Sequence, residues 1–389
     1  MSKLFQAAIV FILSVWCLSA SADEGNPVAV RAWPGGFVTI ETHWGLSVSF
    51  DAKTPANARE PVKVDQELAW PGDYDHVLRR APNAEKPTWA RASEEQSGGS
   101  NDVRVSTLTL ADRKVGVTEV SVDGVRIVFA SSSKVRGNES SVKNDAAIDL
   151  LVLTASSADD VLEDSVTEFV QKLGAKQTLI NMEDMSPEDL DKFAKNVGAE
   201  SLAVAHNTLA LNSTSAVARR VVTLGTKPWE MPDELEELFT AMEKSNAASQ
   251  ETFAKLSVGQ MNFKPKNGTH TPRWNTEHMM GRQLLFFSKI YHTQDSAIPA
   301  MDLNPKQMPP DYEFAHPDWD GKEEARQMQR VSDFTRRFAY LLDGMDVDKK
   351  APGSRWPSLR ALLRQMERHY KEHTGNTVKK FELPDWPSS

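Results

Sequence analysis

The chain has almost no cysteine. Cys17 is the single one among 389 residues, and it lies inside an apolar run near the N terminus. If that run is a cleaved leader, the mature protein has neither disulfide bonds nor a thiol nucleophile. Any catalysis must then use a metal ion, a carboxylate, a hydroxyl or an imidazole.

The sequence also lacks clustered basic residues and internal repeats. The formal net charge is −9 and no block of Lys and Arg stands out, so nucleic acid is not predicted as a partner. With 40% hydrophobic and 25% charged residues, the composition is typical of a folded soluble protein rather than of a disordered chain or a membrane bundle. The length exceeds that of one ordinary core and predicts two domains behind the leader.

Residues 1–22 have the features of a signal peptide. Lys3 precedes the apolar run Phe5 to Leu18, and Ala20-Ser21-Ala22 supplies a small-x-small cleavage site. An uncleaved anchor is the alternative, but the apolar run of about 14 residues is shorter than the roughly 20 that a spanning helix needs. We expect an exported protein, periplasmic or secreted, without a stable membrane span after the leader is removed.

Residues 23–225 predict an α/β domain with a mixed sheet. Alternating apolar and polar residues predict strands in the first part, and Asp123-Gly124 is a strong hairpin signal. The predicted strands there are Gly36–Thr42, Leu46–Phe50, Val103–Leu110, Val115–Val122 and Val125–Ala130. Strands then alternate with helices, namely strand Ile148–Thr154, helix Val161–Leu173, strand Gln177–Asn181, a helix opened by Ser186 and a strand at Ser201–Ala205. This order is typical of a mixed α/β layer structure.

Two segments of this half resemble the metallo-β-lactamase fold. Val38–Val48 is similar to the first strand pair of lactonase-like members, and Ile148–Thr154 is similar to the strand that leads into the family's Thr-His-x-His-x-Asp-His motif. In this chain Ala155-Ser156-Ser157-Ala158-Asp159-Asp160 follows, so every histidine of the motif is missing. The resemblance implies a domain without the family's dinuclear metal centre.

Residues 226–389 predict an all-α domain. A linker rich in Pro and Gly, Leu224–Pro232, leads into four segments with helical periodicity. These are Asp233–Leu256, Asn275–Tyr291, Lys322–Leu342 and Pro357–Thr374, with Gly375 as the expected helix stop. The long proline-rich connection between the second and third helices predicts a four-helix bundle with one crossover. Within that connection, Met301–Tyr312 is a candidate lid, although it can equally be packing.

Three histidines of the helical part form a candidate metal site. His369 and His373 are four residues apart, so they project from the same face of their helix. His278 lies in the first turn of another apolar helix. Three neutral imidazoles from two helices favour zinc or nickel and leave positions open for water or substrate. We interpret His43, His76 and His206 as loop or strand-end residues and His316 as a solvent-facing residue of the crossover. His270, in the loop before the second helix, can line the mouth of the site or have a structural role in the loop. His292 is about 21 Å along the helix from His278, too far to share the ion.

Residues 230–385 resemble the DinB-like superfamily, which includes metal-dependent YfiT-type proteins and bacterial thiol transferases. Members place one histidine near the start of the second helix and a His-x3-His pair in the fourth, which His278, His369 and His373 match. The resemblance implies a metal-dependent hydrolase or a thiol or group transferase acting on a small molecule. The α/β half lies outside this resemblance.

Two roles are open for each of the other polar residues near the histidines in sequence. Glu277 and Glu372, each next to a proposed ligand, are candidates for a general base or for acceptors behind the ligands, or they are exposed helix carboxylates. Arg273 and Arg282 can bind an anionic group or can pair structurally. The function classes left open are a metalloenzyme and a non-catalytic module whose metal pins two helices together.

Overall fold

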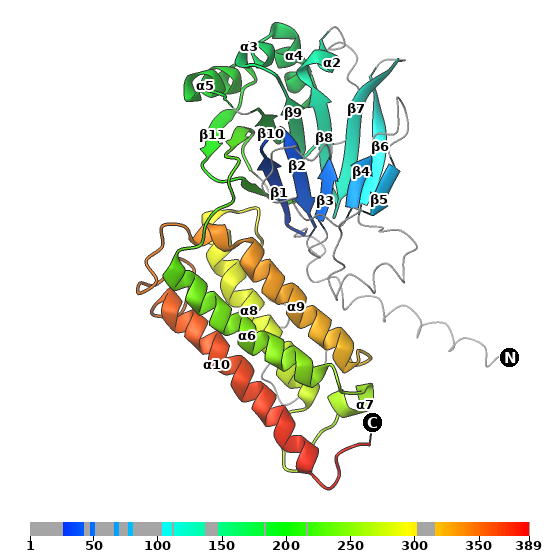
Figure 1. The fold of residues 1–389 in the computed structure, drawn as a ribbon, viewed down its shortest axis with the longest axis vertical. Helices are drawn as coiled ribbons and strands as arrows, with labels where there is room; N and C mark the ends of the chain where they lie inside the picture. Colours follow the sequence, from blue (N-terminus) through cyan, green and yellow to red (C-terminus); the bar gives the residue numbers. More distant parts are fainter. Residues whose placement is uncertain are drawn as a thin grey trace, which may run out of the picture.

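The computed structural model describes residues 26–42, 47–50, 66–69, 77–80, 103–110, 113–136, 147–182, 184–214, 217–301 and 316–388. Figure 1 shows sheets with short helices in the N-terminal part and long helices in the C-terminal part. The expected leader, His43, His76 and nearly all of the candidate lid lie outside the described residues. No helix within these ranges combines the length and apolar character needed to cross a membrane.

One sheet of the described residues has six strands in the order β12-β1-β2-β3-β4-β5. The strands are β1 (Val28–Trp33), β2 (Phe37–Glu41), β3 (Ser47–Phe50), β4 (Gln66–Ala69), β5 (Val77–Arg80) and β12 (Thr208–Leu211). The antiparallel pairing of β2 with β3 joins the two strands predicted at Gly36–Thr42 and Leu46–Phe50. The pairing of β1 with β12, which sequence analysis did not anticipate, joins the two ends of this region.

The second sheet has seven strands in the order β11-β13-β10-β9-β8-β7-β6. They are β6 (Val103–Leu110), β7 (Arg113–Val122), β8 (Val125–Ser131), β9 (Leu150–Thr154), β10 (Gln177–Asn181), β11 (Glu200–Val204) and β13 (Arg220–Leu224). The hairpin between β7 and β8 turns at Asp123 and Gly124, whose φ angles are 50° and 80°, as a type I′ turn requires. From β8 to β11 all neighbours are parallel, so the sheet is mixed, as predicted.

The second sheet is buried on both faces. Leu151 and Leu153 pack with Phe169 and Phe193 from the helices, whereas Leu150 and Val152 belong to a cluster shared with β1 and β2. This division follows from the two-residue period of a strand. The covering helices are α2 (Ser132–Val135), α3 (Ala158–Val161), α4 (Asp164–Leu173) and α5 (Pro187–Asn196). The helix predicted at Val161–Leu173 corresponds to α4, which begins three residues later and ends at the same residue, and the short α3 before it was not predicted.

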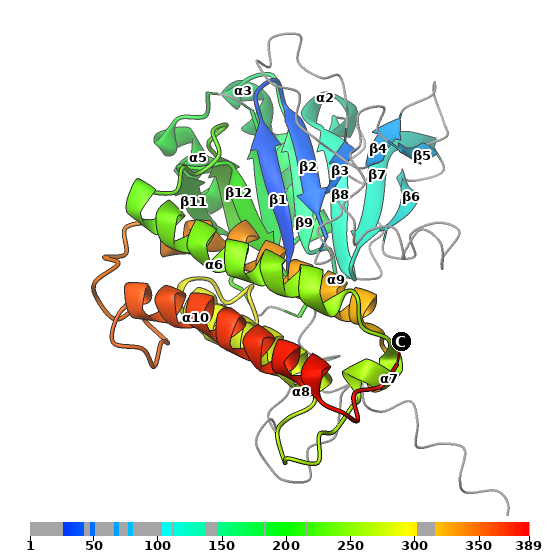
Figure 2. The ribbon, with the colours of Figure 1, turned by 60° about the horizontal axis from the view of Figure 1, so that its bottom comes forward.

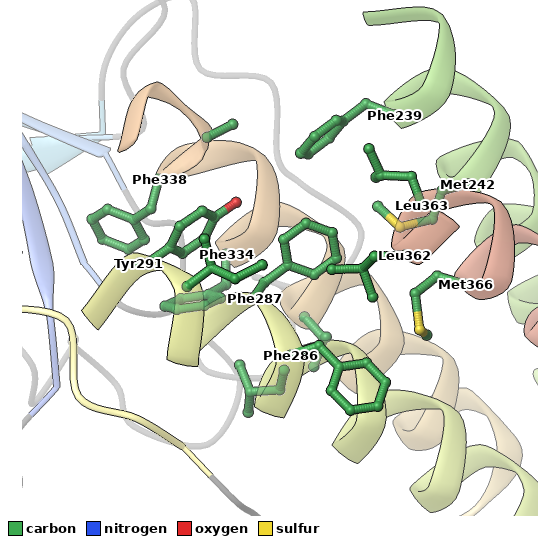
Figure 3. Packing of buried hydrophobic residues seen from close by; sticks show 14 of the residues in the cluster. Phe239, Met242, Phe286, Phe287, Tyr291, Phe334, Phe338, Leu362, Leu363 and Met366 are labelled. Atoms are coloured by element: carbon green, nitrogen blue, oxygen red, sulfur yellow. The ribbon is translucent and has the colours of Figure 1, made fainter. Parts of the chain in front are cut away.

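The C-terminal region is helical. Its elements are α6 (Asp233–Phe253), α7 (Val258–Met261), α8 (Pro272–Gln294), α9 (Gly321–Arg337), α10 (Leu359–Val378) and the short 3₁₀ segments Ala339–Leu342 and Lys379–Glu382. Each long helix packs against two others, α6 against α9 and α10, and α8 against the same two. Figure 2 shows α10 running alongside both α6 and α8. Apolar side chains from all four, including Phe239, Phe287, Phe334 and Leu362, fill the space between them (Figure 3).

Two helix ends differ from those expected. The third predicted helix was extended to Leu342, but α9 ends at Arg337 and a 3₁₀ turn follows. The fourth was expected to stop at Gly375, but α10 continues to Val378. Glycine ends a helix when it takes the left-handed conformation, and Gly375 is not among the described residues with positive φ.

The start of α9 lies directly against the end of α6. The backbone N–H of Gly321 donates to the carbonyl of Leu256 at 2.9 Å. A Cβ atom on Gly321 would collide with the carbonyl oxygen of Phe253. This contact needs glycine, because any side chain would force the two helices apart.

The sheets and the helices meet at a polar and aromatic contact. Arg337, whose side chain is 2% exposed, forms an ion pair with Glu41 of β2 at 2.5 Å. His206 packs against Tyr340 with 4.6 Å between the ring centroids and 53° between the ring planes. Ala29 and Ala210 belong to the same apolar cluster as the helix core. His206 thus lies between the two regions, away from the other histidine cluster described below.

Candidate metal centre

The structure brings His278, His369 and His373 together. One ligand atom from each lies within 4.8 Å of the other two. The ring centroids are 4.8 Å apart for His278 and His369, 4.9 Å for His278 and His373, and 4.4 Å for His369 and His373. Because they come from the facing sides of α8 and α10, the imidazoles converge from two directions.

Local sequence signals fix the helices that carry these histidines. Thr271 caps α8 by accepting a hydrogen bond from the Trp274 N–H at 3.0 Å, and Pro272 occupies the first turn. Ser358 caps α10 in the same way, through the Ala361 N–H at 3.1 Å. Because both helices begin at capped positions, the places of the three histidines along each helix are defined by the sequence.

A buried hydrogen bond holds α8 and α10 in register. The Tyr370 hydroxyl, next to His369 in sequence, donates to the Gln283 carbonyl oxygen at 2.6 Å. The Gln283 amide in turn donates to the Thr335 hydroxyl of α9 at 2.9 Å. These bonds are buried, and a lost partner would leave a buried polar group unsatisfied. They therefore oppose sliding of α10 past α8, which would separate the histidines.

Asn275 orients the ring of His373. The Nδ1 of His373 lies 2.8 Å from the Asn275 side-chain oxygen, while the Asn275 amide donates to the Thr377 hydroxyl at 3.0 Å. Because the amide group is committed to Thr377, the oxygen accepts the proton on Nδ1 of His373. The Nε2 of His373 is then the unprotonated nitrogen, available to a ligand. Sequence analysis missed Asn275, although its place three residues before His278 on one helix was a usable signal.

His369 and His373 are held in their neutral form. Burial, and then the neighbouring His373 and His278, lower the pKa of His369 to about 3. Burial, followed by the charges of His270 and Lys380, lowers the pKa of His373 to about 4. The Nε2 of His369 is buried and has no hydrogen-bond partner. A neutral imidazole with a buried, unpaired nitrogen is the state in which histidine binds metal ions.

An aromatic stack covers one side of the cluster. Trp274 lies parallel to His278, with 4.4 Å between ring centroids and 10° between planes. His270 stacks on the outer face of Trp274 at 3.6 Å. His270 is exposed, so it forms the outer layer of the stack, at the edge of the site, and the indole separates it from His278.

A pocket of about 220 Å³ opens on another side of the cluster. Both His278 and His369 line it, together with Arg282, Phe286, Arg355 and Trp356. A larger hollow of about 730 Å³ lies between α6 and α10, but none of the three histidines lines it. The smaller pocket is therefore the one that gives a ligand access to the imidazoles.

The two glutamates proposed for catalysis, Glu277 and Glu372, have other polar contacts in the structure. Glu277 accepts from the backbone N–H of His316 at 3.4 Å. Burial, followed by the charge of Glu277, raises the pKa of the Glu324 carboxyl to about 8. Glu372 is exposed and lies 3.5 Å from Arg368 in an ion pair one helical turn away. Neither carboxylate belongs to the metal-ligating group found among the described residues. For Glu372 the geometry matches the exposed-carboxylate reading.

The Arg273 side chain pairs with other residues inside the protein and does not face an open site. Its side chain is fully buried and pairs with Glu324 at 2.6 Å, and its Nε donates to Asn262 at 2.5 Å.

Two further histidines lie outside the metal-ligating cluster. His292 contacts the Ile298 carbonyl at 2.8 Å and His316 stacks on Trp319 at 3.6 Å, which agrees with their interpretation as non-ligands.

The donor set fits a divalent metal ion. Three imidazoles are neutral ligands of the kind that zinc and related transition metals accept. Within the described ranges no acidic or thiol side chain joins the group, so the described residues supply three ligands and leave a fourth position for another ligand. In a catalytic site this is the usual arrangement, whereas structural sites have four protein ligands.

Comparisons with known proteins add little to this geometry. No family model matches the chain, and no curated protein matches it. A crystal structure of a candidate Zn-dependent hydrolase of the metallo-β-lactamase superfamily from Thermotoga maritima is similar at 15% identity, with a TM-score of 0.31. The match covers 51% of this chain and 99% of that chain. So low a TM-score supports no conclusion about the function of this chain, and the histidine cluster carries the functional inference.

Proposed function

We propose that residues 226–389 form a DinB-like four-helix bundle in which His278, His369 and His373 hold a divalent metal ion, zinc or nickel. On this proposal residues 23–225 are a separate α/β domain, and residues 1–22 direct export. The protein acts as a metal-dependent hydrolase or as a thiol or group transferase on a small molecule. The observation that carries the proposal is the convergence of three ligand atoms within 4.8 Å.

The chain's own residues would support such a reaction in three ways. Asn275 keeps the proton of His373 on Nδ1, so that Nε2 remains a ligand. Trp274 shields one face of His278 from water. The pocket beside His278 and His369 gives a substrate access to the remaining face. A bound divalent ion would supply a nucleophile at neutral pH, by lowering the pKa of water or by holding a thiol as its thiolate.

A non-catalytic role has one observation in its favour. The three histidines connect α8 with α10, so a bound ion would cross-link two helices and stabilise their packing. A purely structural site would have a fourth ligand from the protein, and the described residues provide three. We therefore place the enzymatic role first.

The test is the metal content of the purified mature chain. We expect about one equivalent of zinc or nickel in the wild type and a large loss in His278→Ala and in His369→Ala. His292→Ala is the matched control, since His292 is on α8 but is exposed and outside the cluster; it should keep the metal. A wild-type protein that stays metal-free after incubation with either ion would contradict the proposal.

A structural role predicts a different pattern from an enzymatic one. If the ion only cross-links helices, its removal should lower the melting temperature, and no exogenous ligand should perturb it. If the site has an open position, cobalt substituted for the native ion should change its visible spectrum when a small anion or thiol is added. A cobalt spectrum that no added ligand alters would favour the structural role.

A further inference from the structure

We infer that the pocket beside the three histidines binds a small carboxylate that carries one apolar ring, and that Arg282 and Arg355 recognise the carboxylate. This inference names the substrate class of the proposed metal site and in that respect rests on the proposed function. It is carried by the charges, the walls and the size of the pocket.

The charges that line the pocket are positive. Arg282 lies one helical turn after His278 on α8, on the same face of the helix, and Arg355 lies before the start of α10. Among the described residues, no acidic side chain lines this pocket. Within the same ranges Arg355 makes no ion pair with a carboxylate, so its charge is left for a ligand. Guanidinium groups bind carboxylates through paired hydrogen bonds.

The metal site adds to this positive field. Three neutral imidazoles do not offset the two positive charges of a divalent ion, and among the described residues no carboxylate belongs to the ligand group. Charges from Arg282 and Arg368 already act on His369. An anion in the pocket would therefore be attracted by the two guanidiniums and, in the loaded protein, by the ion as well.

Aromatic walls give the pocket an apolar part. The guanidinium carbon of Arg355 lies 4.5 Å from the ring centroid of Phe286 and 5.6 Å from that of Trp356. The two rings meet edge to face with 6.0 Å between centroids. Met366 also lines the pocket. The stacked guanidinium is thus oriented by its aromatic neighbours, and the remaining wall suits a hydrophobic ligand body.

The size of the pocket limits the ligand. Its volume is about 220 Å³, and an apolar cavity of about 150 Å³ is enough to hold benzene. One ring with one acidic group therefore fits, while a second ring would have to extend into solvent. A planar monoanion also suits the pocket better than a phosphate dianion, because the aromatic walls cannot replace the stronger hydration of the dianion.

The experiment compares three probes on the zinc-loaded protein by calorimetry. Benzoate has both the ring and the charge, benzamide has nearly the same shape without the charge, and acetate has the charge without the ring. We expect benzoate to bind at least about tenfold more tightly than either of the others, which corresponds to about 1.4 kcal/mol. Equal binding of benzoate and benzamide, or no binding of benzoate, would overturn the inference.

Variants assign the preference to the two arginines. Arg282→Gln and Arg355→Gln should each reduce the preference of the protein for benzoate over benzamide, with zinc content and circular dichroism unchanged. Arg364→Gln is the matched control, because Arg364 is an exposed arginine of α10 that pairs with Glu367 and does not line the pocket. An undiminished preference in both pocket variants would overturn the assignment.

The same probes separate this inference from the proposed metal site. If the wild type binds no metal, the proposed function fails, but the metal-free protein should still prefer benzoate over benzamide because the arginines remain. If metal binds and benzoate has no advantage over benzamide, the metal site stands and the carboxylate pocket is wrong. His369→Ala, which removes one ligand, should lose zinc and keep part of the benzoate preference.

Discussion

The two regions of this protein bury ionisable groups very differently. Among the α/β residues whose side-chain burial the structure describes, Asp149 is the only buried acidic or basic one, and it pairs with Lys176 at 2.8 Å. The described helical region buries six such groups: Arg273, Glu277, His278, Glu324, Arg337 and Lys380. Burial of an ionisable group is unfavourable unless the group has a partner. The buried ionisable groups of the helical region are therefore the ones whose partners need to be identified.

The buried charges of the helical region fall into sets with different roles. Arg273 and Glu324 form a pair that joins the starts of α8 and α9, and Arg337 joins the helices to β2. His278 belongs to a third set with the partly exposed His369 and His373, in which one nitrogen of each ring lies within 4.8 Å of the other two. Among its described residues the α/β region has no comparable group of metal-ligating side chains, so the candidate site lies in the helical region.

The largest effect on stability should come from breaking the buried pair. Glu324→Ala leaves Arg273 charged and fully buried without its 2.6 Å partner, so we expect a loss of about 3–5 kcal/mol in the free energy of unfolding. Lys176→Met in the α/β region should cost less, about 1 kcal/mol, because the lysine is 30% exposed and the buried Asp149 keeps the hydrogen bond from the Arg126 N–H at 2.8 Å. Urea denaturation followed by circular dichroism measures both.

A double variant sharpens this contrast. Arg273→Met combined with Glu324→Leu replaces both charges by apolar groups and should recover much of the stability that Glu324→Ala loses, because no charge is left unpaired. If Glu324→Ala costs no more than Lys176→Met, the buried pair is not a distinguishing feature of the helical region.

Gly321→Ala should have the next largest effect. The added Cβ would collide with the carbonyl oxygen of Phe253, which is backbone and cannot move aside, so we expect a loss of about 1–3 kcal/mol in the free energy of unfolding. Gly259→Ala, where the nearest atom is 3.9 Å away, is the control and should be nearly neutral. Thermal denaturation of both variants, compared with wild type, makes the measurement. Equal melting temperatures would mean that α9 is not so close to α6.

Asn275→Ala should weaken metal binding more than it weakens the fold. Loss of the acceptor for the His373 Nδ1 proton frees the ring to rotate, and such losses behind a ligand reduce metal affinity about 10–100-fold. Asn275→Asp retains an acceptor and should restore most of the affinity. Competition with a chromophoric chelator gives the dissociation constants. If the alanine and aspartate variants bind metal equally, Asn275 does not position His373.

Acid should destabilise the metal-free protein through the histidine cluster. The folded-state pKa values of His369 and His373, about 3 and about 4, lie below the ordinary value of 6.5. Between these limits the unfolded chain binds more protons than the folded one, so stability rises with pH. We expect the melting temperature of chelator-treated protein to fall as the pH drops from about 6.5 to 4.

A double variant tests the source of this acid sensitivity. His369→Gln combined with His373→Gln removes both titrating groups and should flatten the fall in melting temperature between pH 6.5 and 4. The effect should be modest, because both side chains are partly exposed to solvent. An unchanged slope would place the acid sensitivity elsewhere, for instance at His206, whose pKa burial also lowers.

The sequence predicted the parts of the fold that depend on local patterns. The hairpin at Asp123-Gly124, strands such as Gln177–Asn181, the long helices and the helix capped by Ser186 all follow from periodicity, turn residues and caps. The pairing of β1 with β12 could not be predicted in this way, because it joins residues far apart in the chain. Local signals say little about which strands become neighbours.

In the candidate site, too, local spacing was predictable and contacts between helices were not. Helical spacing predicted that His369 and His373 share a face, but it could not show that Asn275 holds one ring or that Trp274 stacks on another histidine. It also left Glu277 as a possible base, whereas Glu277 lies by His316 and Glu324 in the structure. Contacts between helices depend on how the helices pack. The periodicity of the sequence shows only which face of each helix is apolar.

The smallest predicted effect tests the helix end that sequence analysis misplaced. Gly375 lies inside α10, without positive φ, and no atom lies within 4 Å of a Cβ built there. Alanine should fit without strain and restrict the unfolded chain, so Gly375→Ala should stabilise the protein by about 0.5–1 kcal/mol. Thermal denaturation should then show a higher melting temperature for Gly375→Ala and a lower one for Gly321→Ala, although both replace glycine by alanine in the helical region. Destabilisation by Gly375→Ala would mean that Gly375 ends the helix after all, as the sequence pattern predicted.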